Sequence, residues 1–373
     1  MSITHRRRVL GLGAMAVTMA LVSMACSSSK NTTATGSTGG GSSSGGKIAL
    51  LLPETKTARY ETQDKPLFEA KVKELCADCE VLYSNADQDA AKQQSQAEAA
   101  LTNGAKVLVL DPVDSASAAA IANKAKQQNV PVIAYDRLVN DAPISYYISF
   151  DNEQVGKLQG QALVDQLKSE GKTSGGIVMI NGAPTDNNAG LFKAGAHSVI
   201  DSSGFTVAAE FDTPDWSPDK AQSEMDQAIT NLGKDGFVGV YAANDGTAGG
   251  AIAAMKGVGV SPIPPITGQD AELAGIQRVL TGEQYMTVYK TVKLEAQGAA
   301  ALAVALVQGT EPPSGLVTTS VNNKSGDVPS VILTPVAVTK DNVKSTVIAD
   351  GYWTAAQICT DQFKAACTAA GIS

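Results

Sequence analysis

The sequence has 373 residues, of which 43% are hydrophobic, with 29 lysines and arginines against 37 aspartates and glutamates. The formal net charge of −8 disfavours nucleic acid as a partner, because a nucleic-acid-binding surface needs an excess of basic residues to neutralise phosphates. The length is sufficient for two ordinary domains after a targeting segment has been removed.

Residues 1–25 are predicted to be an export signal. Three arginines at positions 6–8 precede an apolar stretch that is too short for a comfortable transmembrane span. The following LVSMAC run resembles the lipobox of bacterial lipoproteins and predicts a lipid on Cys26, on the outer face of the cell membrane or in the periplasm. An ordinary cleaved signal, an uncleaved anchor and a twin-arginine signal remain alternatives. The Ser- and Gly-rich residues 26–46 are expected to form a flexible tether.

Four cysteines follow Cys26, namely Cys76, Cys79, Cys359 and Cys367. An even number in an exported protein suggests two disulfides, and local pairing is the simplest arrangement, although the sequence does not fix the connectivity. A redox role for the CxxC at 76–79 is disfavoured, because the motif follows a predicted helix instead of starting one. The cysteines also lack the paired spacing of a zinc site, so neither a metal nor a cofactor is expected.

From residue 47 onward, short β-rich runs alternate with longer amphipathic runs. The expected strands are 47–53, 80–85, 106–111, 131–135, 146–150, 176–181, 206–211, 237–242, 264–268 and 285–289. The expected helices are 60–75, 88–103, 115–129, 152–169, 187–201, 218–232, 247–258 and 271–281. This alternation predicts an α/β fold with parallel sheets covered by helices. Because one sheet of ten strands would be unusual, we expect two Rossmann-like lobes that divide near residue 150.

Polar and aromatic residues follow most of these strands. In open parallel sheets, ligands bind beyond the carboxyl ends of the strands. The candidate ligand-binding residues are Arg59, Tyr60, Asp136, Arg137, Asp186, Asn188, Trp216, Asn244, Asp270 and Lys290. Carboxylates accept hydroxyl hydrogens, and Arg, Lys and Asn donate to oxygens, so the set suits a sugar whose ring packs on the aromatic faces. The strand ends carry no Gly-rich phosphate-binding loop.

Each of these residues also has a structural interpretation. An Asp or Asn that follows a strand often caps the next helix. A lone arginine or lysine can be a surface charge, and Trp216 can be a core residue at the rim. The coincidence of sugar-compatible groups at seven strand ends favours binding.

At these same residues the chain resembles the D-xylose-binding proteins of ABC transporters, within the type I periplasmic binding protein superfamily. The matching stretches are AYDRLVNDA (134–142), YISFDNE (147–153), TDNNA (185–189), NDGTAGGA (244–251), GQDAELAGI (268–276) and MTVYK (286–290). The similarity runs from about residue 47 to the VILTP run at 331–335 and slightly beyond.

The resemblance implies two lobes joined by a three-stranded hinge, with crossings near residues 150, 290 and 333. The N-terminal lobe is then 47–150 plus 291–332, and the C-terminal lobe is 151–290 plus 333–373. It also implies that the polar candidates bond sugar hydroxyls while Trp216 stacks on the ring, and that the partner is an ABC permease. Tyr60 departs from the tryptophan that is usual there, and the cysteine-bearing tail is a second departure.

Three other classes of protein share features with this sequence. A glycosidase needs two carboxylates that flank the scissile bond, whereas Asp136, Asp186 and Asp270 lie among basic residues and are better explained as hydroxyl acceptors, so no catalytic function is expected. A sugar-responsive repressor needs an N-terminal helix-turn-helix, where an export signal stands instead. A binder of several monosaccharides (glucose, galactose, arabinose) that also or instead signals to a chemoreceptor or sensor kinase remains the alternative. The protein is expected to be a monomer in either case.

Overall fold

The computed structural model describes residues 45–372 and has an α/β fold with mostly parallel sheets, which confirms the predicted fold class. The predicted export signal, Cys26 and nearly all of the tether lie outside the described residues. Among residues 45–372, no helix combines the length and the apolar character that crossing a membrane requires.

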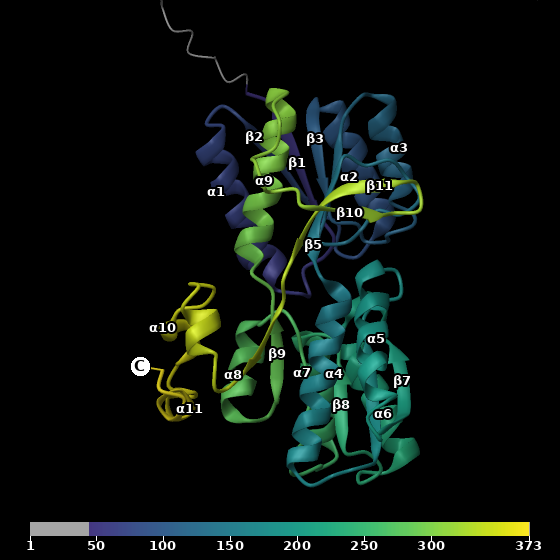
Figure 1. Cartoon of the computed structure of the whole chain (residues 1–373), viewed down its shortest axis with the longest axis vertical. Coiled ribbons are helices and arrows are strands. Elements are labelled where there is room, and N and C mark those ends of the chain that lie inside the picture. The colour runs from purple at the N-terminus through teal and green to yellow at the C-terminus, as the bar shows by residue number, and fades with distance from the viewer. Residues whose placement is uncertain (1–44, 373) are drawn as a thin grey trace, which may run out of the picture. The chain divides into compact units, whose positions relative to one another are not determined.

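The first lobe is built on a seven-stranded sheet in the order β10-β11-β5-β4-β3-β1-β2 (Figure 1). Its strands are β1 (Lys47–Leu52), β2 (Glu80–Asn85), β3 (Ala105–Leu110), β4 (Val132–Tyr135), β5 (Tyr146–Phe150), β10 (Thr319–Asn322) and β11 (Asp327–Leu333). All pairs are parallel except the β10–β11 hairpin. β1 after Lys47 and β3 after Lys106 are continuously apolar, as strand segments buried on both faces must be.

Helices cover both faces of this sheet. They are the π-helical turn η1 (Tyr60–Asp64), α1 (Lys65–Leu75), α2 (Ala90–Thr102), α3 (Ala119–Gln127) and α9 (Val292–Gln308). α1 and α9 contribute Phe68 and Leu302 to the core on one face, while α2 and α3 contribute Leu101 and Ile121 to the core on the other. The sheet is thereby the middle of three layers.

The second lobe repeats this plan on a smaller sheet, β7-β6-β8. Its elements are α4 (Asn152–Ser169), β6 (Gly176–Asn181), α5 (Asn187–Ile200), β7 (Thr206–Asp212), η2 (Pro214–Trp216), α6 (Pro218–Leu232), β8 (Gly239–Ala242), α7 (Asp245–Gly257), α8 (Leu273–Thr281), β9 (Met286–Tyr289) and β12 (Val336–Thr339). The pair α4 and α5 closes the core on one face, and α6 and α7 close it on the other. β9 pairs antiparallel with β12.

The predicted strand at 264–268 is wrong as a strand. Its residues form a single isolated bridge, between Ile266 and Val240, and a second isolated bridge joins the next residue, Gln269, to Val288. Pro264 and Pro265 lack the N–H groups that a continuous ladder requires, so pairing starts only after them. The predicted helix at 115–129 is also shorter, since its regular part spans only Ala119–Gln127.

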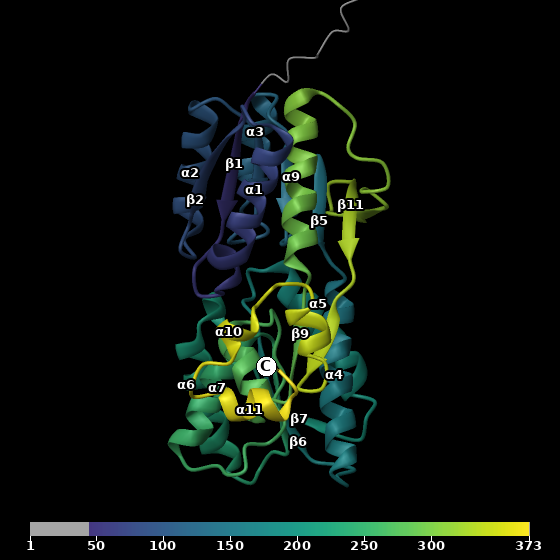
Figure 2. The same cartoon turned by 90° about the vertical axis from the view of Figure 1, so that its left-hand side faces the viewer.

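The chain passes between the lobes three times: after β5, after β9 and after β11. Figure 2 shows β11 pointing down from the first lobe, with the chain after it continuing into the second lobe that contains α4. These are the three segments of the predicted hinge. The residue bounds proposed for each lobe remain a prediction.

A C-terminal tail, residues 340–372, follows β12 and packs on α8 and β9. It contains η3 (Lys344–Ile348), α10 (Ala355–Ile358) and α11 (Lys364–Ala369). Figure 1 shows α10 and α11 beside α8 in the second lobe.

Candidate functional site

Nine of the ten predicted ligand-binding residues line a single cavity between the two lobes. They are Tyr60, Asp136, Arg137, Asp186, Asn188, Trp216, Asn244, Asp270 and Lys290, joined by Thr57, Phe192 and Gln269. The cavity is small, with about 260 Å³ of empty space between its lining atoms. The tenth residue, Arg59, contacts two of them, with Nη1 3.6 Å from Asp136 Oδ2 and 3.7 Å from Asp270 Oδ1.

Two of the aspartates occupy turns in the left-handed backbone region. Asp136 follows β4 with φ 54°, and Asp270 precedes α8 with φ 83°. The N–H of each donates to a neighbouring strand, Asp136 to Ile148 O at 2.9 Å and Asp270 to Val288 O at 2.8 Å. Such backbone is costly for a residue other than glycine, and it is retained where the surroundings impose it.

Two other candidates are both helix caps and lining residues. The Asp186 side chain accepts from Asn188 N at 2.8 Å and caps α5, and Asn244 caps α7 through a reciprocal capping box with Thr247. The capping interpretation and the binding interpretation are therefore compatible at these positions. Capping fixes the carboxylate and the amide at the edge of the cavity.

Lys290 links aspartates that belong to different lobes. Its Nζ lies 3.7 Å from Asp136 Oδ1 and 3.3 Å from Asp270 Oδ1, and its side chain is only 3% exposed. Burial by itself would raise the pKa of Asp136, but the neighbouring cations Lys290, Arg59 and Arg137 lower that pKa to about 2. Burial likewise opposes the charge of Lys290, yet Asp136 and Asp270 raise its pKa above the usual value. Both groups are charged at neutral pH.

Arg59 is held by two acids that the sequence analysis did not identify. Its Nε and Nη2 donate to Asp64 at 2.9 and 2.6 Å, and Nη2 also donates to Glu295 at 2.7 Å. Asp64 lies five residues after Arg59, a spacing that does not place two side chains on one face of an α-helix, so the sequence carries no signal for this pair. The π-helical turn η1 brings the two side chains together. Glu295 is 236 positions away, and no local signal connects the two residues.

Arg137 occupies an acidic environment of its own. Its Nε lies 3.1 Å from Asp186 Oδ2 and 3.6 Å from Asp111 Oδ1. Burial raises the pKa of Asp111 well above its usual value, although Arg137 opposes the shift. Asp111 directly follows β3, so the rule that polar residues at strand ends form the site could have identified it.

The two predicted aromatic residues line the cavity in different ways. Trp216 packs edge-on against Phe192, at 6.3 Å between ring centroids, and its Nε1 donates to Asp186 Oδ2 at 3.2 Å. A Cβ on Gly182 would lie 2.0 Å from this indole, so only glycine fits there. The Tyr60 hydroxyl donates to Asp136 Oδ2 at 3.0 Å and accepts from Arg137 Nη2 at 3.4 Å.

Several buried polar atoms around the cavity lack a well-aligned hydrogen bond within residues 45–372. They are Arg59 Nη1, Arg137 Nε, Asn188 Oδ1, Gln269 Oε1 and Asp270 Oδ1. Two of them, Arg137 Nε and Asp270 Oδ1, nevertheless lie at ion-pair distance from Asp186 and Lys290. Buried polar groups are normally hydrogen-bonded, because an unmet group costs about 1–3 kcal/mol. Donors and acceptors from both lobes are thus available to a ligand with several hydroxyl groups.

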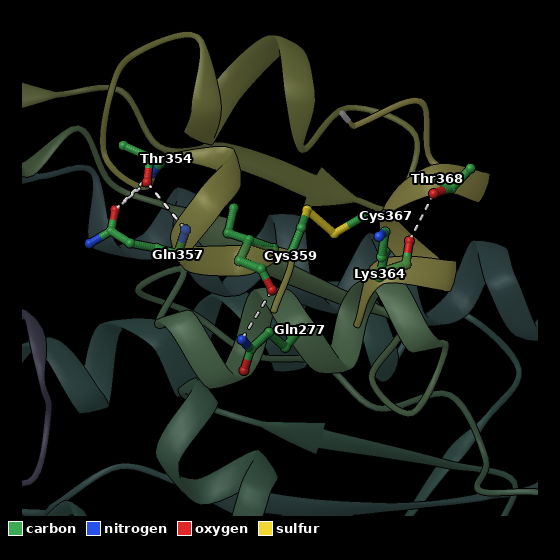
Figure 3. The surroundings of a disulfide bond; sticks show 8 residues. Gln277, Thr354, Gln357, Cys359, Lys364, Cys367 and Thr368 are labelled. Carbon is green, nitrogen blue, oxygen red and sulfur yellow. Dashed lines mark hydrogen bonds between the residues drawn. A yellow bond between two sulfur atoms is a disulfide. The ribbon is translucent and has the colours of Figure 1, made fainter. Parts of the chain in front are cut away.

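The four cysteines within residues 45–372 do not line the cavity. Cys76 pairs with Cys79 at the end of α1, and Cys359 pairs with Cys367 in the tail, where the Gln277 side chain of α8 donates to the Ile358 carbonyl at 3.2 Å (Figure 3). Over the described part of the chain, no group of three or more His, Cys, Asp or Glu side chains is placed to hold a metal ion.

Comparisons with known proteins agree with this architecture. The chain is 41% identical to the D-xylose-binding periplasmic protein of Escherichia coli over 82% of this chain and 90% of that protein. It is 36% identical to a multiple sugar-binding periplasmic receptor of Rhizobium radiobacter, over 73% of this chain and 81% of that protein. The crystal structure of an ABC transporter solute-binding protein from Clostridium phytofermentans with bound β-D-glucose is 31% identical, with a TM-score of 0.77, and covers 84% of this chain and 99% of that one. The family model for the periplasmic binding protein domain matches residues 48–311, and the chain belongs to that family.

Proposed function

We propose that this chain is an exported solute-binding protein that captures a monosaccharide, D-xylose or a close relative, and delivers it to an ABC importer. The observation that carries the proposal is the set of buried donors and acceptors without a well-aligned hydrogen bond around a small cavity that both lobes line. A sugar hydroxyl both donates and accepts, so it can bond a carboxylate and a guanidinium at once.

Nine of the ten candidate residues, all except Tyr60, are proposed to contact the sugar as follows. Asp136, Asp186 and Asp270 accept hydroxyl hydrogens, while Arg59, Arg137 and Lys290 donate. Asn188 and Asn244 provide further polar contacts, and Trp216 packs on one face of the ring. The likeness to xylose-binding and multiple sugar-binding proteins supports these roles.

Capture is proposed to proceed by hinge closure. Contacts between the lobes include Ser115 N to Thr185 O at 3.0 Å and Asn188 Nδ2 to Asp136 O at 3.0 Å. A sugar that bonds residues of both lobes gains its full set of contacts only when the lobes meet, so it favours the closed form by that difference in affinity. The permease then recognises the closed surface.

The proposed function is binding without catalysis. A pKa of about 2 keeps Asp136 ionised at neutral pH, so it cannot serve as a general acid. The other acids at the cavity contact Arg59, Arg137 or Lys290, as hydroxyl acceptors in a binding site can.

A binder of several monosaccharides that also signals to a chemoreceptor or sensor kinase is the second candidate. Tyr60 favours it, because its hydroxyl occupies one oxygen of Asp136 that could otherwise bond the sugar. The name of the Rhizobium radiobacter relative, a multiple sugar-binding receptor, is also consistent with it.

A thermal-shift and calorimetric panel tests the ligand. The purified protein is titrated with D-xylose, glucose, galactose, arabinose, ribose and fucose, since a ligand that binds only the folded state raises the melting temperature. A rise with xylose alone supports the first candidate, and rises with several pyranoses support the second. Arg137→Ala serves as the site control, and we expect it to weaken binding by about 2 kcal/mol. The absence of a rise with any sugar would reject both candidates.

We also propose that Cys26 carries a lipid and that the four other cysteines form two disulfides after export. Labelling with a fatty-acid analogue, in the natural protein and in Cys26→Ser, tests the anchor. Label that persists in the variant, or that is missing from the natural protein, would reject it.

A further inference from the structure

We propose that the C-terminal tail is a positioning element of the binding site, which holds the turn at Asp270 in the conformation that directs its carboxylate into the cavity. The proposal rests on the proposed function in so far as Asp270 bonds the sugar. The tail lies beyond the residues 48–311 that the family model matches.

The tail provides two hydrogen bonds to this turn. Tyr352 Oη donates to the carbonyl oxygen of Asp270 at 3.1 Å, and Trp353 Nε1 donates to the carbonyl oxygen of Ala271 at 2.8 Å. Both side chains are buried, with 6% and 7% exposure. Asp270 and Ala271 are consecutive left-handed residues, at φ 83° and 47°, and neither is glycine. The tail therefore satisfies the carbonyl oxygens of a backbone that would otherwise be unfavourable.

The equivalent turn in the first lobe shows what such a hydrogen bond does. Asp136 is also left-handed, and its carbonyl oxygen accepts from Tyr147 Oη at 3.2 Å. Tyr147 belongs to β5, the strand whose Ile148 carbonyl accepts the Asp136 N–H. Each lobe thus presents one left-handed aspartate whose carbonyl oxygen is held by a tyrosine hydroxyl. In the first lobe this tyrosine comes from the sheet, whereas in the second it comes from the tail.

The tail is fixed in place by its own packing. The Tyr352 ring lies 5.1 Å from the ring of Tyr289, the last residue of β9, and 5.3 Å from the ring of Trp353. Directly after Trp353, α10 is tied to α8 by the Gln277 hydrogen bond, and the Cys359–Cys367 pair closes the segment (Figure 3).

The tail also reaches the first lobe. Gln63 Nε2, in η1, donates to the carbonyl oxygen of Tyr352 at 3.1 Å, and Leu67 of α1 packs against the tail cluster. The residue that positions Asp270 thus also contacts the helical segment that follows Arg59. This contact therefore joins the two lobes.

Amide hydrogen exchange on the full chain without sugar tests the positioning directly. Exchange is measured in Tyr352→Phe, in Trp353→Phe and in the double variant. In the double variant we expect the amides of Asp270 and Ala271 to exchange at least ~10-fold faster than in the natural protein, with little change at Asp136. Tyr83→Phe is the matched control, because it also removes a tyrosine hydroxyl bond, to Glu61, away from the turn. Unchanged exchange at Asp270 and Ala271, or an equal increase at Asp136, would overturn the proposal.

Affinity for the best sugar of the panel is the second readout. Each single variant is expected to weaken binding about 5-fold, whereas Tyr83→Phe stays within about 2-fold of the natural protein. Faster exchange with unchanged affinity would refute a role of the turn in binding. If the natural protein binds no sugar, the proposed function fails, while the exchange result still decides whether the tail holds the turn.

Discussion

Replacement of Lys290 by methionine tests the charge arrangement at the centre of the cavity. The variant keeps most of the side-chain volume but removes the cation that contacts Asp136 and Asp270 from opposite lobes. The pKa of Asp136 is about 2 against an ordinary 3.8, which corresponds to about 2 kcal/mol of net stabilisation of its carboxylate. Of the three cations that lower the pKa of Asp136, Lys290 has the largest effect. Removal of one partner of a buried pair costs about 3–5 kcal/mol, so we expect a loss of stability of that order at pH 7.

The pH dependence gives this prediction a sign. Because the folded pKa of Asp136 is lowered, its stabilisation is fully present above pH 3.8 and is lost as the pH falls toward about 2. Urea unfolding of the natural protein, Lys290→Met, Asp136→Asn and the double variant, without sugar, completes a double-mutant cycle. We expect a coupling free energy of about 2 kcal/mol at pH 7 that shrinks toward pH 2. A coupling below about 0.5 kcal/mol at pH 7 would refute the reasoning.

Three further outcomes are expected. Asp270→Ala should weaken sugar binding by about 2 kcal/mol in calorimetry, because it leaves a hydroxyl and neighbouring cations unpaired, and natural affinity would remove Asp270 from the site. Burial raises the pKa of Asp245 from 3.8 to about 7 despite opposing hydrogen bonds. The protonated Asp245 side chain therefore contributes at most about 4 kcal/mol to the stability of the fold; this contribution is fully present below pH 3.8 and is lost as the pH rises through 7. Asp245→Asn should flatten the fall in melting temperature between pH 4 and 8, and an equally steep fall would contradict this assignment. Replacement of Cys359 and Cys367 by serine should lower the free energy of unfolding by about 2–3 kcal/mol in calorimetry, and an unchanged value would argue against a disulfide.

The fold and the membership of the cavity follow from local sequence signals. Apolar runs between amphipathic segments predict parallel strands, and the carboxyl ends of such strands meet at one edge of a sheet. The sequence therefore predicts that Asp136, Asp186 and Asp270 lie close together. The wrong prediction of a strand at 264–268 also has a local cause. It relied on the hydropathy of the segment, whereas the two prolines lack the N–H groups that strand pairing requires.

The residues that hold the ligand-binding side chains in place could not be predicted in the same way. Glu295 lies on α9 among apolar residues, and only the packing of α9 beside α1 brings it to Arg59. The tail presents the same difficulty, since Tyr352 follows no strand end and its contact with Asp270 depends on tertiary packing. Contacts between residues distant in sequence carry no periodic or spacing signal, so they require the folded chain.

The separation between Arg59 and Glu295 has a kinetic consequence. Their ion pair closes a loop of 236 positions, and the Gln63–Tyr352 hydrogen bond spans 289. Contacts of such high sequence separation tend to form late, after shorter loops have closed. A sugar that needs the completed site can bind only after the folding barrier has been crossed. Added sugar should therefore slow unfolding and leave the rate of refolding unchanged.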